Sequence, residues 1–227
     1  LRSAIAKAID KSQISEVIYQ GVRKPASGLL PPGIPGFKSG QGLTDSRDLA
    51  GAKADYKKWL ALGNKTPSPI RLSYNDGAGW DKVASIIVAN LKDVGIPAKL
   101  DPFAADGTYF SKMRSGKGQI IRGGWFADYP IADNFLYPLL HSKTIDGDNL
   151  ERYNSKAFDA LVDSARSSTN KSFAQSQYRR AEVQALKTDV VMVATVNRGV
   201  AVVLASSTST FPITPLGMIV YDQIVKN

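Results

Sequence analysis

The 227-residue chain contains 43% hydrophobic residues, 22% charged residues and no cysteine, and its formal net charge is +9. These fractions and this length indicate a folded protein of one large or two modest domains. The absence of cysteine excludes disulfides, thiolate zinc sites and cysteine nucleophiles. The positive charge does not indicate a nucleic-acid partner, because basic and acidic residues alternate, as in "TDSRDLAGAKADYKKW" (44–59), which is typical of solvated helix faces.

The N-terminal region predicts two helical pieces followed by a loop. Apolar residues recur at helical spacing over 1–19, and the segment "DKSQISEVI" (10–18) divides this helix. The segment "KPASGLLPPGIPGF" (24–37) contains four prolines and three glycines, so it forms neither a helix nor a central strand. The chain opens at Leu1 without an initiating Met or a signal segment, so we expect it to be a piece of a longer protein.

The next region predicts one helix and then a βαβ unit. The segment "SRDLAGAKADYKKWLALG" (46–63) is helical, with Ser46 or Asp45 as its N-cap and Gly63 at its end. A strand, an amphipathic helix and a second strand then follow, an order that builds a parallel sheet with a right-handed crossover. These three segments are "IRLSYN" (70–75), "WDKVASIIVANLKDVG" (80–95) and "IPAKLDPF" (96–103).

The remaining sequence predicts a short helix, a third strand, two further helices and two apolar strand-like runs. We expect Asn154 to cap the first of the two further helices. The longest apolar run is about seven residues, well short of the roughly 18 that a membrane span requires. In chain order the segments are 107–116, 119–125, 155–168, 171–188, 189–197 and 199–206.

The only histidine is His141, in "PLLHSKT" (138–144). Zinc sites need three or four ligands, and a Ser-His-Asp triad would have to use this one residue in a context that lacks a nucleophile elbow. We therefore expect a surface or capping histidine, no metal site and no cofactor.

The stretch "RGGWFADYPIADNFL" (122–136) places an arginine, two glycines, an indole and a carboxylate directly after an apolar run. Glycines inside a strand often mark close approach of a ligand or another backbone. From the residues alone, Trp125 is either a core residue or the wall of a pocket. Asp128 either caps a turn before Tyr129 or binds a ligand, and Arg122 faces either a ligand or solvent.

Three segments together resemble family 5 extracellular solute-binding proteins, the peptide-binding components of ABC importers. The segment 1–33 is similar to the opening of their second lobe, with Ala-Ile-Asp, Tyr-x-Gly and a Pro-rich loop. The segment 74–100 resembles the next βαβ unit, and "GGWFADYPIADNFL" (123–136) resembles a Gly-Trp-x-x-Asp-Tyr signature. The sequence departs from that signature at Ile131 and Ala132, where relatives commonly have Asp-Pro.

The resemblance implies an α/β lobe of the periplasmic-binding-protein type (class II), with an open mixed sheet flanked by helices. Residues 1–198 would form this ligand-binding lobe, and 199–227 would return to a first lobe that the sequence does not contain. The implied partners are a peptide or other small solute and an ABC importer permease. The implied location is periplasmic or extracellular and associated with the cell surface, with membrane attachment only through an N-terminal anchor or signal.

The resemblance also implies roles for the signature residues. Asp128 corresponds to the aspartate that pairs with the α-amino group of a bound peptide, and Arg122 to an arginine that some relatives direct toward the peptide's carboxylate. Trp125 would wall the pocket beside the bare backbone of Gly123 and Gly124. The remaining residues of the signature, which shape the rim or serve the fold, are Tyr129, Asn134 and Phe135.

Other functions stay open at this point. Within the family, the ligand could be a nickel chelate, an opine or an oligosaccharide. Asp128 and Asp133 could be the carboxylate pair of a glycosidase, although no sugar-binding aromatics accompany them. A chaperone-like interaction domain is a third alternative, and it would bind unfolded polypeptide without regard to free termini.

Overall fold

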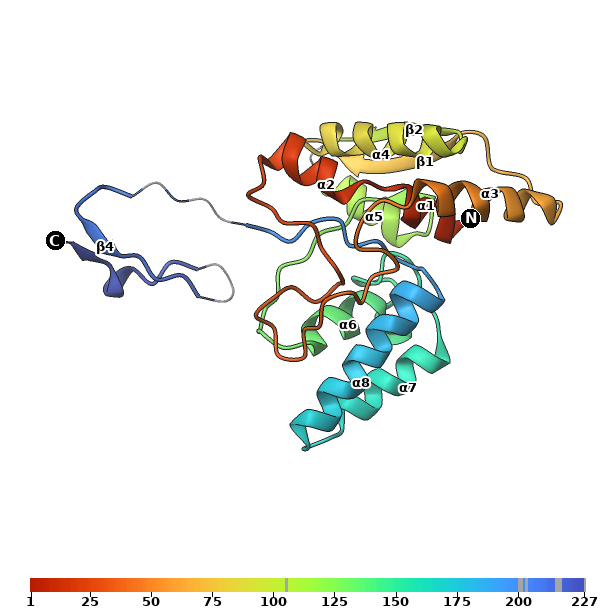
Figure 1. The fold of residues 1–227 in the computed structure, drawn as a ribbon. Helices are drawn as coiled ribbons and strands as arrows, with labels where there is room; N and C mark the ends of the chain where they lie inside the picture. Colours follow the sequence, from red (N-terminus) through yellow and green to blue (C-terminus); the bar gives the residue numbers. More distant parts are fainter. Residues whose placement is uncertain (105, 200–201, 203, 215–217, 227) are drawn as a thin grey trace.

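The computed structural model describes the chain except for residues 105, 200–201, 203, 215–217 and 227. Figure 1 shows a sheet with its helices in the upper part, a helical layer in the lower part, and a C-terminal ribbon that projects to one side. Of the described residues, none lie in a helix long and apolar enough to cross a membrane.

The sheet of the upper part has three parallel strands in the order β2, β1, β3. They are β1 (Ile70–Asn75), β2 (Ala98–Phe103) and β3 (Ile120–Ile121). The crossover helix α4 (Trp80–Val94) ends at Gly95, whose φ of +88° suits the left-handed cap position that glycine favours. The predicted βαβ unit and the α/β class are therefore confirmed. The antiparallel pairing that a mixed sheet would contain is absent from this three-stranded sheet; among the described residues it occurs in the separate β4–β5 ladder and in isolated bridges.

The N-terminal helices pack against α4. The predicted division of the first helix is confirmed, because α1 (Arg2–Ala8) is followed by α2 (Lys11–Gln13) and a π-helical turn, η1 (Ile14–Ile18). The next helix, α3 (Leu49–Ala61), packs against α1 and α4. Its N-cap is Asp48, whose side chain accepts a hydrogen bond from the Gly51 N–H at 2.8 Å.

The caps predicted for two helices are wrong by one to three residues. The N-cap of α3 is Asp48 rather than Ser46 or Asp45, because only Asp48 lies three residues before the free N–H of Gly51. At α7 (Lys156–Arg166) Ser155 replaces Asn154, and its Oγ accepts from the Phe158 N–H at 3.4 Å.

The third strand is shorter than the predicted 119–125. It begins after helix α5 (Thr108–Arg114), and it pairs with β1 only at Ile120 and Ile121. The Tyr109 hydroxyl then donates to the carbonyls of both Ser73 and Arg122, at 3.1 and 2.6 Å. The Tyr109 side chain thus bonds the Arg122 carbonyl in place of the next backbone hydrogen bond between β1 and β3. The backbone after Arg122 therefore leaves the sheet.

The lower part consists of three helices and the Pro-rich loop. The sequence did not predict α6 (Asp133–Leu140), which contains Pro138. The two predicted helices are α7 and α8 (Lys171–Val183), and α8 continues as a π-helical turn, η3 (Gln184–Thr188). The buried core of this part includes Leu30 from the loop, Leu136 and Leu140 from α6, Phe158 from α7 and Ala181 from α8.

The two C-terminal runs predicted as strands do not form a sheet among the described residues. Residues 189–197 make one isolated bridge, between Val196 and Pro25. The run does not begin as a strand, because Val190 has a φ of +47°, which lies outside the extended region. Residues 200–201 and 203 of the second run lie outside the described residues.

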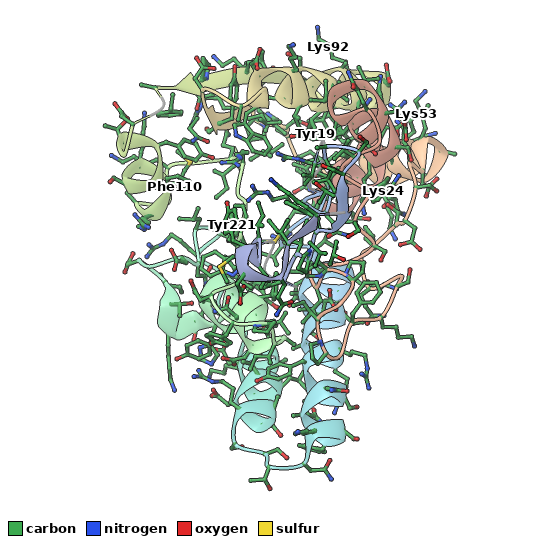
Figure 2. All side chains as sticks on the ribbon, turned by 90° about the vertical axis from the view of Figure 1, so that its left-hand side faces the viewer. Tyr19, Lys24, Lys53, Lys92, Phe110 and Tyr221 are labelled. Atoms are coloured by element: carbon green, nitrogen blue, oxygen red, sulfur yellow. The ribbon has the colours of Figure 1, made fainter. Side chains whose placement is uncertain are left out.

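The projecting ribbon contains β4 (Thr208–Thr210), the turn η4 (Tyr221–Gln223) and β5 (Val225–Lys226). β4 and β5 pair antiparallel. In Figure 2 the ribbon faces the viewer and carries Tyr221, whose side chain is 73% exposed. Large apolar side chains on this ribbon are therefore not covered by the lobe.

Candidate ligand-binding site

The signature residues lie where two parallel strands end. β1 ends at Asn75, and β3 leads through Ile121 into Arg122. In open parallel sheets, ligands bind at the carboxyl ends of the strands. The stretch after Arg122 then runs from the sheet to α6, so it connects the upper and lower parts of the molecule.

Asn134 on the first turn of α6 organises this stretch. Its Oδ1 accepts from the Asp128 N–H at 2.8 Å and from the Trp125 Nε1–H at 3.2 Å. Its Nδ2 donates to Asp128 Oδ2 at 3.2 Å. The Asn134 side chain is buried, so these three bonds are partly shielded from water. One amide side chain thereby fixes both the indole and the carboxylate that the sequence selected.

Asp128 is exposed, and one of its carboxylate oxygens remains free. The ion pairs of the described residues do not include Asp128. In the same part of the chain, its side chain accepts no backbone N–H, so the turn-capping alternative is not what the structure shows. A carboxylate that is held in place and unpaired is suited to accept a cationic group from outside the chain.

Trp125 and the two glycines come shortly before Asp128 in the same stretch. Trp125 is half-buried and packs against the core of the lower part, which is the first of the two alternatives left open by the sequence. Gly123 and Gly124 are both exposed. A Cβ added at Gly123 would meet no atom within 4 Å, so nothing in the described protein requires glycine at this position.

Arg122 is half-buried and does not extend into solvent. Its guanidinium carbon lies 3.6 Å from the ring centroid of Trp80, and its NH1 donates to Asn75 Oδ1 at 3.1 Å. Burial lowers the pKa of the guanidinium from its usual value. Its backbone N–H donates to the Ser73 carbonyl at 2.9 Å, which anchors the residue to β1.

Tyr129 and Asp133 belong to a network that serves the fold. The Tyr129 hydroxyl donates to Asp133 Oδ2 at 2.9 Å, while the Tyr178 hydroxyl and Arg166 Nε reach Asp133 Oδ1 at 3.1 and 3.2 Å. Burial, with a smaller contribution from the Asp133 carboxylate, raises the pKa of Tyr129. Asp133 is buried and fully engaged, so it does not provide the second free carboxylate that a glycosidase pair with Asp128 requires.

His141 was expected to be either a surface or a capping histidine. It caps the short helix η2 (Ser142–Thr144) and is not a surface residue. Its side chain is 1% exposed, and Nδ1 accepts from the Lys143 N–H at 3.1 Å. Nε2 lies 3.3 Å from Asp163 Oδ1 on α7. Within the described residues, no group of three His, Asp or Glu side chains is arranged to hold a metal ion.

Sequence reasoning missed the residues that position the site. It assigned no role to Asn75, Trp80 or Tyr109, and it treated Asn134 as a rim or structural residue. The available signal was the nearness of Trp80 and Asn75 to the end of a predicted strand, which is where side chains of a parallel sheet meet.

The family model of bacterial extracellular solute-binding proteins, family 5 Middle, matches residues 1–147. The chain therefore belongs to this family. It is 30% identical over 197 residues to heme-binding protein A of Haemophilus influenzae, covering 81% of this chain and 34% of that protein. It is 27% identical over 188 residues to the dipeptide-binding protein of Escherichia coli, again covering 81% of this chain and 34% of that protein.

Solved structures show the same fold. HbpA2 from Haemophilus parasuis matches with a TM-score of 0.84 at 21% identity, over 100% of this chain and 44% of that chain. The periplasmic binding protein DppA from Helicobacter pylori, solved with the peptide STSA, matches with a TM-score of 0.73 at 26% identity, over 86% of this chain and 37% of that chain. The chain thus spans about a third of the length of the curated relatives it matches.

Proposed function

We propose that this chain is the second lobe of a two-lobe binding protein that captures peptides and delivers them to an ABC importer permease. Family membership and the dipeptide-binding relative support this role. In the proposal, residues 1–198 form the lobe and 199–227 return to the first lobe. The projecting, partly apolar ribbon suits a segment that packs elsewhere. The proposed location is the periplasm or the cell surface, because a relative is named as a periplasmic oligopeptide-binding protein.

The observation that carries the proposal is the Asp128 carboxylate. Asn134 orients it, no cation of the described residues pairs with it, and it lies in the stretch that leads from the carboxyl end of β3 to α6. A peptide's α-ammonium group would supply the missing positive charge once cleft closure removes water from the pair. Trp125 and the bare backbone at Gly123 and Gly124 would then contact the peptide beside its amino terminus.

Other small solutes are the alternative that the relatives raise, and heme is the specific case. The sequence contains one histidine, and His141 is 1% exposed at the end of α6, so it offers no axial imidazole at the site. A nickel chelate or an oligosaccharide would leave the charge of Asp128 without an α-ammonium partner, and an opine would offer only a secondary ammonium. The geometry therefore favours a peptide with a free amino terminus.

Native mass spectrometry of the full-length protein, purified without refolding, tests this function. We expect bound masses that match short peptides and that disappear after partial unfolding and dialysis. A bound heme, a sugar or a metal chelate in their place would contradict the proposal. Adding a free-amine dipeptide to the stripped protein should restore a bound state, and the same dipeptide with an acetylated amine is the matched control.

A further inference from the structure

A cavity of about 320 Å³ lies in the lower part of the molecule, away from the signature stretch 122–136. It is formed by α8, α7 and the segment 36–42 at the end of the Pro-rich loop. A Cβ added at Gly36 would lie 3.4 Å from Gln175 Cγ, so this segment packs against α8, and both figures show the loop beside that helix. We call this cavity the basic pocket, and its lining includes Lys38, Gln41, Leu161, Arg179, Arg180 and Val183.

The basic pocket carries three positive charges, and its lining contains no Asp or Glu. Within the described part of the chain, Lys38, Arg179 and Arg180 take part in no ion pair. The one hydrogen bond that their side chains make there joins Arg180 Nη1 to the neutral amide oxygen of Gln177, at 3.0 Å. Like charges that share a site repel one another, so an anion bound between them would be stabilised.

Gln41 provides an independent indication of a ligand. It is 7% exposed and lines the basic pocket, yet its side-chain amide makes no hydrogen bond to any described residue. Buried side-chain amides normally have a partner. A Cβ added at Gly28 would lie 3.1 Å from Gln41 Cβ, so the residue is held in a close-packed position. A preordered, unused amide at a cavity suits a hydrogen bond to a bound molecule.

The carboxylate of Glu182 lies beside Gln41 but does not neutralise the basic pocket. Its Oε1 accepts from the N–H groups of Leu29 and Leu30, at 2.6 and 3.0 Å. It forms no ion pair with a basic side chain of the described residues. Burial raises the pKa of Glu182, which favours its uncharged form. The three cations therefore remain available for an anion from outside the chain.

We propose that the basic pocket binds a phosphate group that is attached to a small organic part. Guanidinium forks bind phosphate oxygens bidentately, and an ammonium adds a point charge. A tetrahedral phosphate directs its oxygens to several sides, so it can meet cations from both α8 and the loop, whereas a carboxylate has two oxygens in one plane. The volume exceeds that of one phosphate, and Leu161 and Val183 provide an apolar side for the organic part.

The test measures binding by calorimetry at constant ionic strength, in a buffer without phosphate. The probes are inorganic phosphate, glycerol 3-phosphate and succinate, which carries two carboxylates in place of a phosphate. A phosphate ester of this kind is found either on a free solute or in a phospholipid headgroup. Co-sedimentation with phosphatidylglycerol vesicles, compared with phosphatidylcholine vesicles, distinguishes these two sources.

The main variant is Arg179→Gln/Arg180→Gln. Its matched control is Lys57→Gln/Lys58→Gln, which removes the same charge from two consecutive exposed residues of α3, in the upper part of the molecule in Figure 1. Gln41→Ala tests the unused amide. Thermal melting followed by circular dichroism shows that each variant is folded, and if the arginine variant unfolds, Lys38→Gln in the exposed part of the loop takes its place.

We expect glycerol 3-phosphate to bind with a Kd of about 1 mM or tighter and succinate to bind at least about ten-fold more weakly. The arginine variant should weaken glycerol 3-phosphate by at least about ten-fold, because charge-assisted hydrogen bonds are lost, and Gln41→Ala by about five-fold for one neutral bond. The lysine control should bind as the parent does. Loss of vesicle binding in the arginine variant alone would assign the site to a lipid headgroup, and equal vesicle binding in both double variants to a free solute.

Three results would overturn the proposal: no binding of either phosphate probe, equal affinity for succinate and glycerol 3-phosphate, or equal losses in the arginine and lysine variants. The last would show that only the net charge of +9 attracts the anion. None of the probes carries an amine, so failure of this test leaves amine recognition by Asp128 standing.

Discussion

Asn134 and Asp128 are joined by two hydrogen bonds in opposite directions. Asn134 Oδ1 accepts from the Asp128 N–H at 2.8 Å, and Asn134 Nδ2 donates to Asp128 Oδ2 at 3.2 Å. The pair therefore fixes both the backbone and the carboxylate of Asp128, while leaving its second oxygen free. The same amide oxygen also receives the Trp125 indole N–H. The geometry of the candidate site thus depends on one buried residue of α6.

Replacing Asn134 by alanine should destabilise the chain by about 2 to 3 kcal/mol, because three hydrogen bonds are lost and a partly buried indole N–H is left without a partner. Urea unfolding at equilibrium measures this change. Asn64→Ala is the matched control, because exposed Asn64 donates only one bond, to the Trp59 carbonyl at 2.9 Å, and its loss should cost less than about 1 kcal/mol. Equal losses in both variants would show that Asn134 does not organise the stretch.

Gly123→Ala separates a role in folding from a role in binding. An added Cβ meets no atom within 4 Å, so the free energy of unfolding should change by less than about 0.5 kcal/mol. If a ligand approaches the bare backbone, the methyl group should weaken its binding by about 1 to 3 kcal/mol. Gly107→Ala is the control for both measurements, because Gly107, the N-cap residue before α5, is equally unobstructed. Unchanged peptide affinity in the full-length Gly123 variant would remove Gly123 from the site.

Glu182 on α8 predicts a specific dependence of stability on pH. Its Oε1 accepts from the N–H groups of Leu29 and Leu30 at 2.6 and 3.0 Å, while Oε2 is buried without a partner. Burial raises its pKa above the usual value of 4.5. Above about pH 4.5 the unfolded chain releases this proton and the folded chain keeps it, so stability falls as pH rises through the folded-state pKa and then levels off.

Glu182→Gln should make this fall smaller, because glutamine keeps an acceptor for the two N–H groups and does not ionise; the remaining fall belongs to Glu151, whose pKa burial raises to about 7. Chemical unfolding at several pH values between about 4 and 8 measures the effect. The control is Glu16→Gln, since Glu16 is exposed and its replacement should leave the slope as in the parent. The same fall in stability in the Glu182 variant would show that another group causes it.

The βαβ unit could be predicted because its signals are local. Helical periodicity, a glycine at the left-handed position of Gly95 and an alternating strand all lie within about 30 residues, the usual span of such a unit. Helix α6 was missed because it is short, contains Pro138 and directly follows a turn, so no periodic pattern develops. The run 189–197, which was wrongly predicted as a strand, has strand-like composition, but its bridge partner is a proline-containing loop.

The candidate site could be predicted only in part, for a related reason. Trp125 and Asp128 could be selected together because they lie close in sequence, and the structure shows that they share Asn134 as a partner. The surroundings of Arg122 could not be predicted, because Trp80 and Arg23 come from segments about 40 and 100 residues away, and only the folded sheet brings such segments together.

The chain by itself should fold cooperatively but bind peptides no better than about millimolar, or roughly 4 kcal/mol. Without a second lobe, an ion pair at Asp128 remains in water, where it contributes only about 0 to 1 kcal/mol. The chain should also self-associate, because it exposes large apolar side chains on the ribbon and near Trp125. These are Phe126, Ile131, Leu204, Ile213, Met218, Tyr221 and Val225. Sedimentation at several concentrations and peptide titration measure both properties, and micromolar binding by a strictly monomeric chain would contradict the proposed half-protein.

The most direct measurement is calorimetry of the full-length protein and its Asp128→Asn variant with a free-amine peptide and the same peptide N-acetylated. Asp76→Asn, an exposed aspartate just after β1, is the control for a general loss of negative charge. We expect Asp128→Asn to weaken the free-amine peptide by about 2 to 5 kcal/mol, the usual cost of leaving one partner of a buried charge pair alone. The acetylated peptide should bind the parent and the variant almost equally. An equal loss for both peptides, or no loss for either, would contradict recognition of the amine by Asp128.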